Sequence, residues 1–329
     1  MSIPLMRPTL RRRDFNSVLS CLVSDKIGPG ALTRQLAADL CALTGASGGA
    51  CLATFRDALQ TALTVLELQP GDAVVVSALA PQEYLEVLRL QGLKALVADV
   101  EPRRPTLAAA EARALVASGA KAIVLHHTLG FCPTGEELAQ VGVPVIEDLT
   151  QSLGGKWGGN PCGGVGTVTV LSLEPQGIVT TGGGAAVLSR DRKLAKAIQG
   201  VAEGSLRSLA LPDMNAALGI AQLKEIPRFL HARNELADIF LRSLQKSRHA
   251  PLVAGSGSEG EPENVSYSFP VLVREGLREV RQYATKKGVE TEPAFRDSIV
   301  ALRSAADAVA GGPAVPSGVP DAAPGGSEL

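Results

Sequence analysis

Four short apolar runs, separated by segments with helical periodicity, constrain the fold of this chain more than any other feature of its sequence. The runs lie at residues 73–76, 95–100, 122–125 and 144–146. Apart from Asp99 near the end of the second run, each is continuously apolar, as expected for a strand that is buried on both faces. Strands that alternate with helices along a chain form a parallel sheet covered by helices on both sides. The sequence therefore predicts an α/β protein built on a mostly parallel sheet.

Helical periodicity flanks and separates these runs. The pattern over 14–43 is interrupted at 28–30 and predicts a helix, a turn and a second helix. The pattern over 214–244 predicts one long helix or a broken pair, with Pro227 as the interruption. Single helices are expected at 54–68, 82–91 and 107–118.

The 329 residues suffice for a large domain with a smaller companion. We expect the large domain over 1–245 and a small α+β domain over 246–300. Residues 301–329 are rich in Ala, Gly and Pro and contain few large apolar side chains, so we expect this tail to be disordered. Within the small domain the sequence predicts strands at 267–273 and 289–291 and a helix at 277–287.

The composition argues against several classes of partner. A formal net charge of -1 and an aromatic content of 3% disfavour a nucleic-acid-binding surface. No apolar stretch is long enough for a membrane span, and the start of the chain does not resemble a signal peptide. The five cysteines are an odd number without CxxC spacing, which indicates reduced thiols. We therefore expect a cytoplasmic protein that binds neither nucleic acid nor membrane.

One stretch, over residues 145–187, carries a family resemblance: it reads VIEDLTQSLGGKWGGNPCGGVGTVTVLSLEPQGIVTTGGGAAV. It resembles the cofactor-binding core of the DegT/StrS family of sugar aminotransferases, which use pyridoxal phosphate (PLP). The resemblance implies the fold type I of PLP-dependent transferases, with a large mostly parallel-sheet domain, a small α+β domain and a dimeric assembly. Further family-like segments follow in the family's order at residues 3–8, 26–30, 98–102, 216–223 and 267–269.

The resemblance places the family's essential lysine at Gly177. In the family, this lysine lies between a Ser-aromatic pair and a Thr-Thr-Gly turn, and it carries PLP as an imine. Glycine has no side chain, so it can neither form the Schiff base nor move the proton in transamination. Relatives with histidine at this position use it as a base in dehydration, which glycine also cannot do. We therefore assign no catalytic residue.

The resemblance implies three retained cofactor-binding residues. Asp148 would face the pyridine nitrogen of PLP, Gln151 would lie near the cofactor, and Ser172 would contact its phosphate. The residues by themselves allow other interpretations. An aspartate after a buried strand is often a helix cap, and a serine at a strand end often bonds the backbone.

Two other parts of the family's cofactor site are altered. The Ser-Gly-Thr that holds the phosphate falls at Thr54, Phe55 and Arg56. Arg56 either meets an anion as a charged fork or is an ordinary exposed helix residue. The ring that stacks on PLP is expected within 77–83, but that segment contains no aromatic residue. The next aromatic residue along the chain is Tyr84. These positions therefore form a degenerate phosphate and stacking site.

The histidines and cysteines do not by themselves predict a metal site. His126 and His127 are adjacent, so on a strand they point to opposite faces and cannot share a metal. A zinc site of one histidine with Cys132 and Cys162 is conceivable, but buried thiols and a structural histidine are the favoured interpretation. We expect no metal.

The loss of the lysine, the stacking ring and the phosphate cup favours a pseudoenzyme that does not transaminate. Such a protein would bind or scaffold, as a homodimer or as a heterodimer with an active paralogue, and could hold a sugar nucleotide. Whether the chain is an enzyme stays open at this point, with Gly177 favouring its inactivity.

Two alternatives remain. In the first, the chain is an aminotransferase or related enzyme of nucleotide-sugar or polysaccharide biosynthesis. It would then hold PLP noncovalently through Asp148, Gln151 and Ser172. In the second, it is a structural partner in an envelope- or polysaccharide-assembly complex and needs no small ligand.

Overall fold

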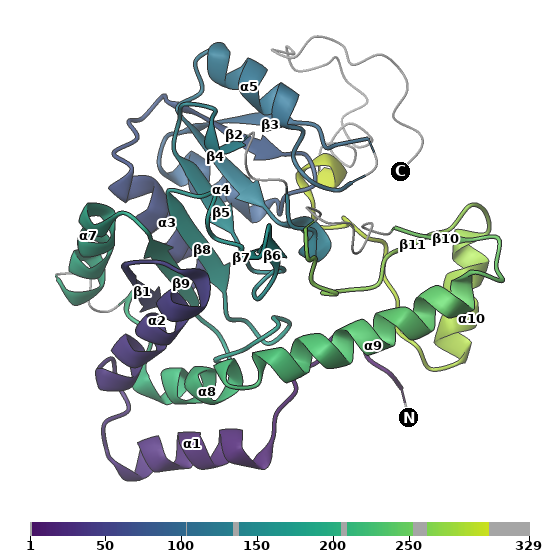
Figure 1. Ribbon diagram of the computed structural model, residues 1–329, viewed down its shortest axis with the longest axis horizontal. Coiled ribbons are helices and arrows are strands. Elements are labelled where there is room, and N and C mark those ends of the chain that lie inside the picture. The colour runs from purple at the N-terminus through teal and green to yellow at the C-terminus, as the bar shows by residue number, and fades with distance from the viewer. Residues whose placement is uncertain (1, 103, 134–137, 205–208, 253–261, 303–329) are drawn as a thin grey trace.

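The computed structural model describes residues 2–102, 104–133, 138–204, 209–252 and 262–302. The centre of the protein is a seven-stranded sheet in the order β1-β9-β8-β5-β4-β2-β3 (Figure 1). Neighbouring strands are parallel except in the two pairs that β9 makes, with β1 and with β8. The expected mostly parallel α/β sheet is confirmed. Its strands are β1 (Gly48–Leu52), β2 (Ala73–Ser77), β3 (Lys94–Ala98), β4 (Ala122–His126), β5 (Val145–Asp148), β8 (Val168–Ser172) and β9 (Ala185–Ser189).

Helices cover both faces of this sheet. In β2, Val74 and Val76 pack into the core on one face, whereas Val75 packs into the core on the other. Both sides of the strand are therefore buried, which is why its sequence is continuously apolar. The first face is covered by α3 (Phe55–Val65), α4 (Glu83–Leu90) and α7 (Arg192–Glu203), and the second by α2 (Ala31–Thr44), α5 (Ala109–Ala117) and α8 (Asp213–Leu223).

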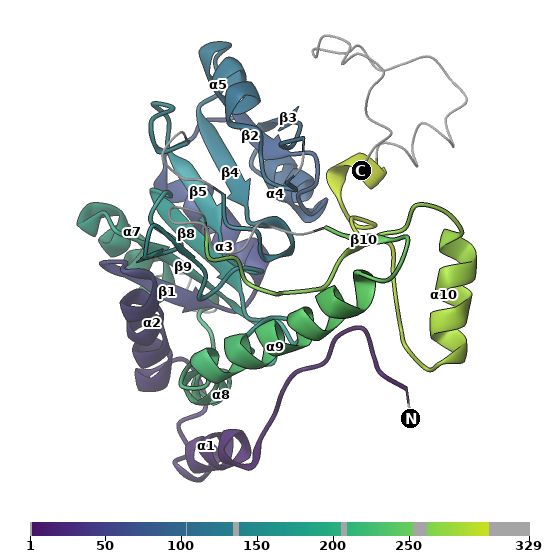
Figure 2. The same ribbon diagram turned by 45° about the vertical axis from the view of Figure 1, so that its right-hand side comes forward.

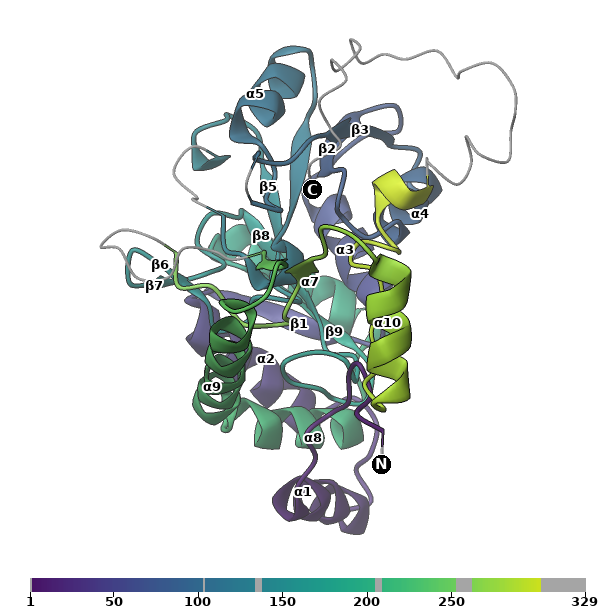
Figure 3. The same cartoon turned by 90° about the vertical axis from the view of Figure 1, so that its right-hand side faces the viewer.

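Further elements extend the molecule away from the sheet. The helix α1 (Arg12–Val23) lies along α8 as an outermost layer, and α9 (Ile226–Leu244) leads from α8 toward α10 (Leu277–Lys286), as Figures 1 and 2 show. Figure 3 views the molecule from that end, with α9 and α10 in front of the sheet. The smaller elements are η1 (Thr128–Gly130), β6 (Lys156–Trp157), β7 (Asn160–Pro161), β10 (Ala250–Pro251) and β11 (Val271–Leu272).

The helical pattern over 214–244 is a broken pair. The helix α8 ends at Leu223 and α9 begins at Ile226, so the break comes before Pro227. Proline is compatible with the first turn of a helix, because the N–H that it lacks has no partner there. Pro227 thus marks the start of α9, not an interruption within it.

The strands predicted in the C-terminal part are mostly wrong. Within 267–273 only Val271–Leu272 pairs, with β10, while Tyr267 is buried in the core on the second face of the sheet. Within 289–291 only Val289 pairs, through a parallel bridge to Ile3. The apolar residues that suggested strands serve instead to pack against other elements, a tertiary use that strand propensity does not reveal.

The end of the described chain returns to the large sheet. Ile299 is fully buried in the first-face core, and its N–H donates to the carbonyl of Ala80 over 3.0 Å. We propose that residues 1–245 form the large domain and 246–300 the small one, with the segment around Ile299 fastening the two together. Most of the tail expected to be disordered, residues 303–329, lies outside the described residues.

Among the described helices, none combines the length and the apolar character that crossing a bilayer requires. The longest, α9, has 19 residues and carries charged side chains along its length, including Arg228, Glu235 and Arg242.

The turn η1 anchors a distant part of the chain at Gly130. This glycine has a φ of +86°, and a Cβ on it would lie 2.1 Å from the carbonyl oxygen of Val265. The N–H of Val265 donates to the carbonyl of Gly130 over 2.9 Å. Only glycine combines a left-handed backbone with such a close approach of another chain segment.

We expect Gly130→Ala to lower the free energy of unfolding by about 3 kcal/mol, because it adds backbone strain and a clash with Val265. The matched control is Gly142→Ala, where φ is +81° and no atom lies within 4 Å. This control should lose only about 1 kcal/mol. Urea unfolding followed by far-UV circular dichroism measures both values, and equal losses would contradict the close packing at Gly130.

Candidate functional site

The carboxyl ends of parallel strands bring the candidate site residues to one edge of the sheet. Strand β5 lies between β4 and β8, and His126 at the end of β4 is in register with Asp148 at the end of β5. Ser172 ends the next strand, β8. Asp148 is the last residue of its strand rather than the first of a loop, so it is no helix cap. Ligand sites of open α/β sheets form at this edge.

The carboxylate of Asp148 is buried, with 1% of the residue exposed, and all its acceptor positions are used. Oδ1 accepts from the N–H of Thr150 over 2.8 Å and from its hydroxyl over 2.5 Å. Oδ2 accepts a short hydrogen bond from the Tyr84 hydroxyl and lies 3.1 Å from Nδ1 of His126. A carboxylate offers about four lone-pair sites. The protein itself therefore saturates Asp148.

The charges of this cluster are fixed by their surroundings. Burial raises the pKa of Asp148, but hydrogen bonds and charge from His126, with further bonds from Thr150 and Tyr84, outweigh burial and lower it. Burial, together with the Asp148 charge, raises the pKa of Tyr84 well above its usual value. Asp148 is thus an anionic acceptor at neutral pH, and Tyr84 is a neutral donor.

Tyr84 is the residue whose importance the sequence did not reveal. It is fully buried in the first turn of α4. Its ring stacks on Phe55, with 6.1 Å between the ring centroids, and meets His126 edge-on at 6.0 Å. The signal was its place just after the ring-free segment 77–83, but only the packing of α4 turns its hydroxyl to Asp148.

The loop at the family's lysine position is built around a glycine. The N–H of Gly177 donates to the carbonyl of Glu174 over 2.9 Å. A Cβ on Gly177 would lie 2.7 Å from the carbonyl oxygen of Val179, closer than real Cβ contacts allow. Every lysine in the sequence is exposed, including Lys156 on the β6–β7 hairpin. The described residues therefore include no buried lysine that could replace the missing one.

Gln151 and Ser172 are both half-buried and are engaged by the protein itself. The side-chain oxygen of Gln151 accepts from the N–H of Leu129, which has a left-handed φ of 57°. The hydroxyl of Ser172 accepts from the N–H of Glu174 over 3.3 Å, as a serine at a strand end often does. Thr150 links the two sides of the site, since its hydroxyl also accepts from the N–H of Ser172 over 2.9 Å.

The degenerate phosphate positions do not converge on a common point. Thr54 caps α3, its hydroxyl accepting from the N–H of Asp57 over 3.1 Å. Phe55 packs against the core and Tyr84. Arg56 is exposed and pairs with Glu86 at 2.8 Å, as an ordinary surface arginine would.

The comparison with known proteins agrees with this architecture. The family model described as DegT/DnrJ/EryC1/StrS aminotransferase family matches residues 8–313. A GDP-perosamine synthase from Caulobacter vibrioides is 28% identical, covering 72% of this chain and 69% of that protein. A UDP-4-amino-4-deoxy-L-arabinose--oxoglutarate aminotransferase from Shewanella sediminis is 26% identical, covering 71% of this chain and 67% of that protein.

Solved structures show the same fold. An aminotransferase from Streptoalloteichus hindustanus superposes with a TM-score of 0.82 at 22% identity, over 90% of this chain and 86% of that one. The E. coli GDP-4-keto-6-deoxy-D-mannose-3-dehydratase with bound hydrated PLP has a TM-score of 0.83 at 17% identity, over 93% and 89%. The expected PLP-dependent transferase fold is confirmed. With the family model matching nearly the whole length, this chain belongs to the DegT/DnrJ/EryC1/StrS aminotransferase family.

Proposed function

We propose that this family member does not transaminate and acts by binding another protein chain. The observation that supports this most directly is the saturation of Asp148, whose Oδ2 accepts from the buried hydroxyl of Tyr84. The resemblance assigns this carboxylate to the pyridine nitrogen of PLP. In this chain the Tyr84 hydroxyl already donates to Oδ2 of Asp148, the carboxylate to which a pyridinium N–H would have to donate.

The residues around Asp148, as arranged here, do not fit PLP. A pyridinium would have to displace Tyr84, whose ring lies against both Phe55 and His126. Displacement would break a buried hydrogen bond to a charged group, which contributes about 1.5–3 kcal/mol. It would also move a large side chain out of the core, at further cost.

Covalent attachment of the cofactor is also unsupported. Gly177 offers no amine, and its loop leaves too little space for a side chain. The family's chemistry needs that amine both to hold the cofactor and to move a proton. Loss of the amine and saturation of Asp148 are separate changes, and both favour an inactive site.

A second candidate function is an aminotransferase or related enzyme of nucleotide-sugar biosynthesis with noncovalently bound PLP. The comparisons favour it more directly than the first, because the relatives named above are aminotransferases, a synthase and a dehydratase. The lowered pKa of Asp148 also favours it, since an anionic carboxylate is what a pyridinium needs. This candidate requires the Tyr84 side chain to leave its buried position.

An exposed apolar stripe on α1 supports a protein partner. Phe15, Leu19, Leu22 and Val23 lie on one side of the helix and are 57%, 55%, 42% and 83% exposed. The opposite side of α1 packs on α8, and α1 is an outermost element in Figure 1. Apolar surface gathered on one exposed face is typical of an interaction site. We propose that a second copy of this chain covers it, in the cytoplasm, where buried free thiols stay reduced.

Titration with PLP distinguishes the two candidate functions. For the pseudoenzyme we expect no saturable change in visible absorbance and no single reducible adduct after borohydride, because Asp148 is saturated and Gly177 has no amine. Asp148→Asn serves as the control: weak reaction of surface lysines would persist in it. Saturation that Asp148→Asn abolishes would favour the second candidate and contradict the first.

The variant Tyr84→Phe tests the bond to Asp148. At pH 7 we expect it to lower the free energy of unfolding by about 2 kcal/mol, because a buried charged acceptor loses its donor. The folded-state pKa of Asp148 is lowered, so its charged form contributes stability above its ordinary pKa. That contribution, and with it the deficit of the variant, should disappear as the pH falls through the folded pKa.

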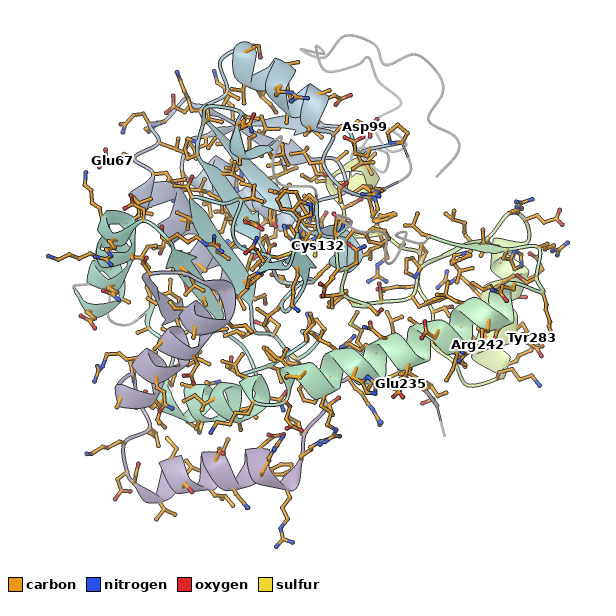
Figure 4. All side chains as sticks on the ribbon, in the orientation of Figure 1. Glu67, Asp99, Cys132, Glu235, Arg242 and Tyr283 are labelled. Carbon is orange, nitrogen blue, oxygen red and sulfur yellow. The ribbon has the colours of Figure 1, made fainter. Side chains whose placement is uncertain are left out.

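The control for this variant is Tyr283→Phe, because Tyr283 is 64% exposed on α10 (Figure 4). It should leave the stability unchanged across the same pH range when both are measured by urea unfolding. A pH-independent loss in Tyr84→Phe would mean that packing, and not the bond to Asp148, explains the effect.

The double variant Phe15→Asp with Leu19→Asp tests the α1 surface. We expect the wild-type protein to have twice the chain mass of 34.0 kDa by light scattering, and the variant to be a folded monomer. Asn16→Asp adds a charge to the same helix beside the stripe and should remain a dimer. A wild-type monomer at micromolar concentration would contradict the proposed dimer.

A further inference from the structure

Three buried residues that the proposed function does not use converge on one point. His127 follows β4, Cys132 follows η1, and Cys162 follows β7. The imidazole of His127 and the two Sγ atoms have ligand atoms that all lie within 4.8 Å of one another. The three residues are only 1%, 2% and 8% exposed. Cys132 is labelled in Figure 4 near the middle of the molecule, close to the β6–β7 hairpin.

The imidazole of His127 has one nitrogen without a hydrogen-bond partner among the described residues. Nδ1 lies 2.7 Å from the hydroxyl of Ser152. Nε2 is 3.2 Å from Oε1 of Glu147 but is not aligned with it for a hydrogen bond. A buried ring nitrogen that faces a carboxylate without an aligned hydrogen bond is only partly satisfied. This misaligned pair is a second observation, beside the clustered ligand atoms, that points to a cation at this place.

Glu147 is held rigidly beside this nitrogen. Its Oε1 accepts from the N–H of Gly163 over 2.8 Å, and its Oε2 accepts from the N–H groups of Val165 and Gly166 over 3.1 and 2.7 Å. These donors belong to the loop that starts at Cys162. One loop therefore fixes both the carboxylate and a thiol.

We propose that His127, Cys132 and Cys162 bind a zinc ion. Glu147 would become the fourth ligand once the thiols rotate toward it, because its carboxylate lies close to His127 but outside the group of mutually close ligand atoms. Zinc favours tetrahedral sites of nitrogen, sulfur and carboxylate oxygen. With bonds of about 2.0–2.2 Å to nitrogen and oxygen, neighbouring ligand atoms stand about 3.3 Å apart. The 3.2 Å between Nε2 of His127 and Oε1 of Glu147 matches one edge of such a tetrahedron.

The surroundings supply the remaining requirements of a zinc site. With a metal on Nε2, the proton of the ring would lie on Nδ1 and be donated to the Ser152 hydroxyl 2.7 Å away, which would fix the ring. All four ligands are buried, so the site has no open position for water and is structural rather than catalytic. The proposal is independent of whether the chain transaminates.

A metal here would fasten a weak element to the sheet. The hairpin of β6 and β7 has only two paired residues in each strand, too few to be stable alone. Gly155, just before β6, lies so close to Cys132 that a Cβ on it would be 2.6 Å from the sulfur. Zinc would join this hairpin to the ends of β4 and β5 and exclude water from the junction.

The test is the metal content of the full-length protein, purified under reducing conditions without a metal-affinity tag. Elemental analysis by inductively coupled plasma mass spectrometry should find about one zinc ion per chain. Cys132→Ser and Cys162→Ser should each reduce bound zinc by about fivefold or more, whereas Cys41→Ser, a buried thiol outside the cluster, should keep it. Zinc retained by the Cys132→Ser/Cys162→Ser double variant would overturn the proposal.

A second measurement, on the wild-type protein, tests the site even if the cysteine variants do not fold. Cobalt added after removal of zinc by a chelator should produce the intense absorption of thiolate-to-cobalt charge transfer, saturating at about one equivalent. Chelation should also lower the melting temperature, and added zinc should restore it. A folded, reduced protein that binds neither metal, or a disulfide between Cys132 and Cys162 in protein with thiols blocked at lysis, would refute the site.

Discussion

The buried carboxylate of Asp148 is the interaction on which the functional edge of this protein depends. A charge inside a protein is stable only when its acceptor positions are filled. Three separate segments fill them: the first turn of α4 through Tyr84, the end of β4 through His126, and the loop after β5 through Thr150. Thr150 then reaches β8 through Ser172. The network that satisfies Asp148 thus holds the ends of three strands and one helix together.

The alternation of side chains along a strand explains why this edge has two distinct chemistries. Glu147 and Asp148 end β5, and His126 and His127 end β4 or directly follow it. Because successive side chains point to opposite faces, His126 meets Asp148 on one side and His127 meets Glu147 on the other. The first pair is closed by an aromatic cluster and the second by thiols. One register therefore produces two buried acid–imidazole pairs, one at the family's cofactor position and one at the proposed metal.

The surroundings of Asp148 agree with the proposal that this protein keeps the family's fold but does not transaminate. Catalytic sites often contain strained backbone, unsatisfied polar groups or loosely packed side chains that the chemistry requires. Around Asp148 the opposite has happened, because Tyr84 and Phe55 pack as core residues do and Gly177 sits in a tight loop. Buried polar groups that are fully satisfied in this way add rigidity. Such a site favours stability over turnover, which is why we favour binding over catalysis.

The α/β class, the family and the loss of the lysine all follow from the amino-acid sequence, because each depends on local features of the chain. Continuous apolar runs indicate strands that are covered by helices on both faces of the sheet. The glycine at position 177 is visible in the sequence without any structure. Local patterns failed where residues serve distant partners, as at Tyr267, which is buried in a core and not in a strand. The tertiary structure alone decided that Tyr84 closes over Asp148 and that Cys132 and Cys162 meet at His127. Tyr84 and Asp148 are 64 positions apart and Cys132 and Cys162 are 30 apart, and only the packing of helices and hairpins on the sheet brings them together.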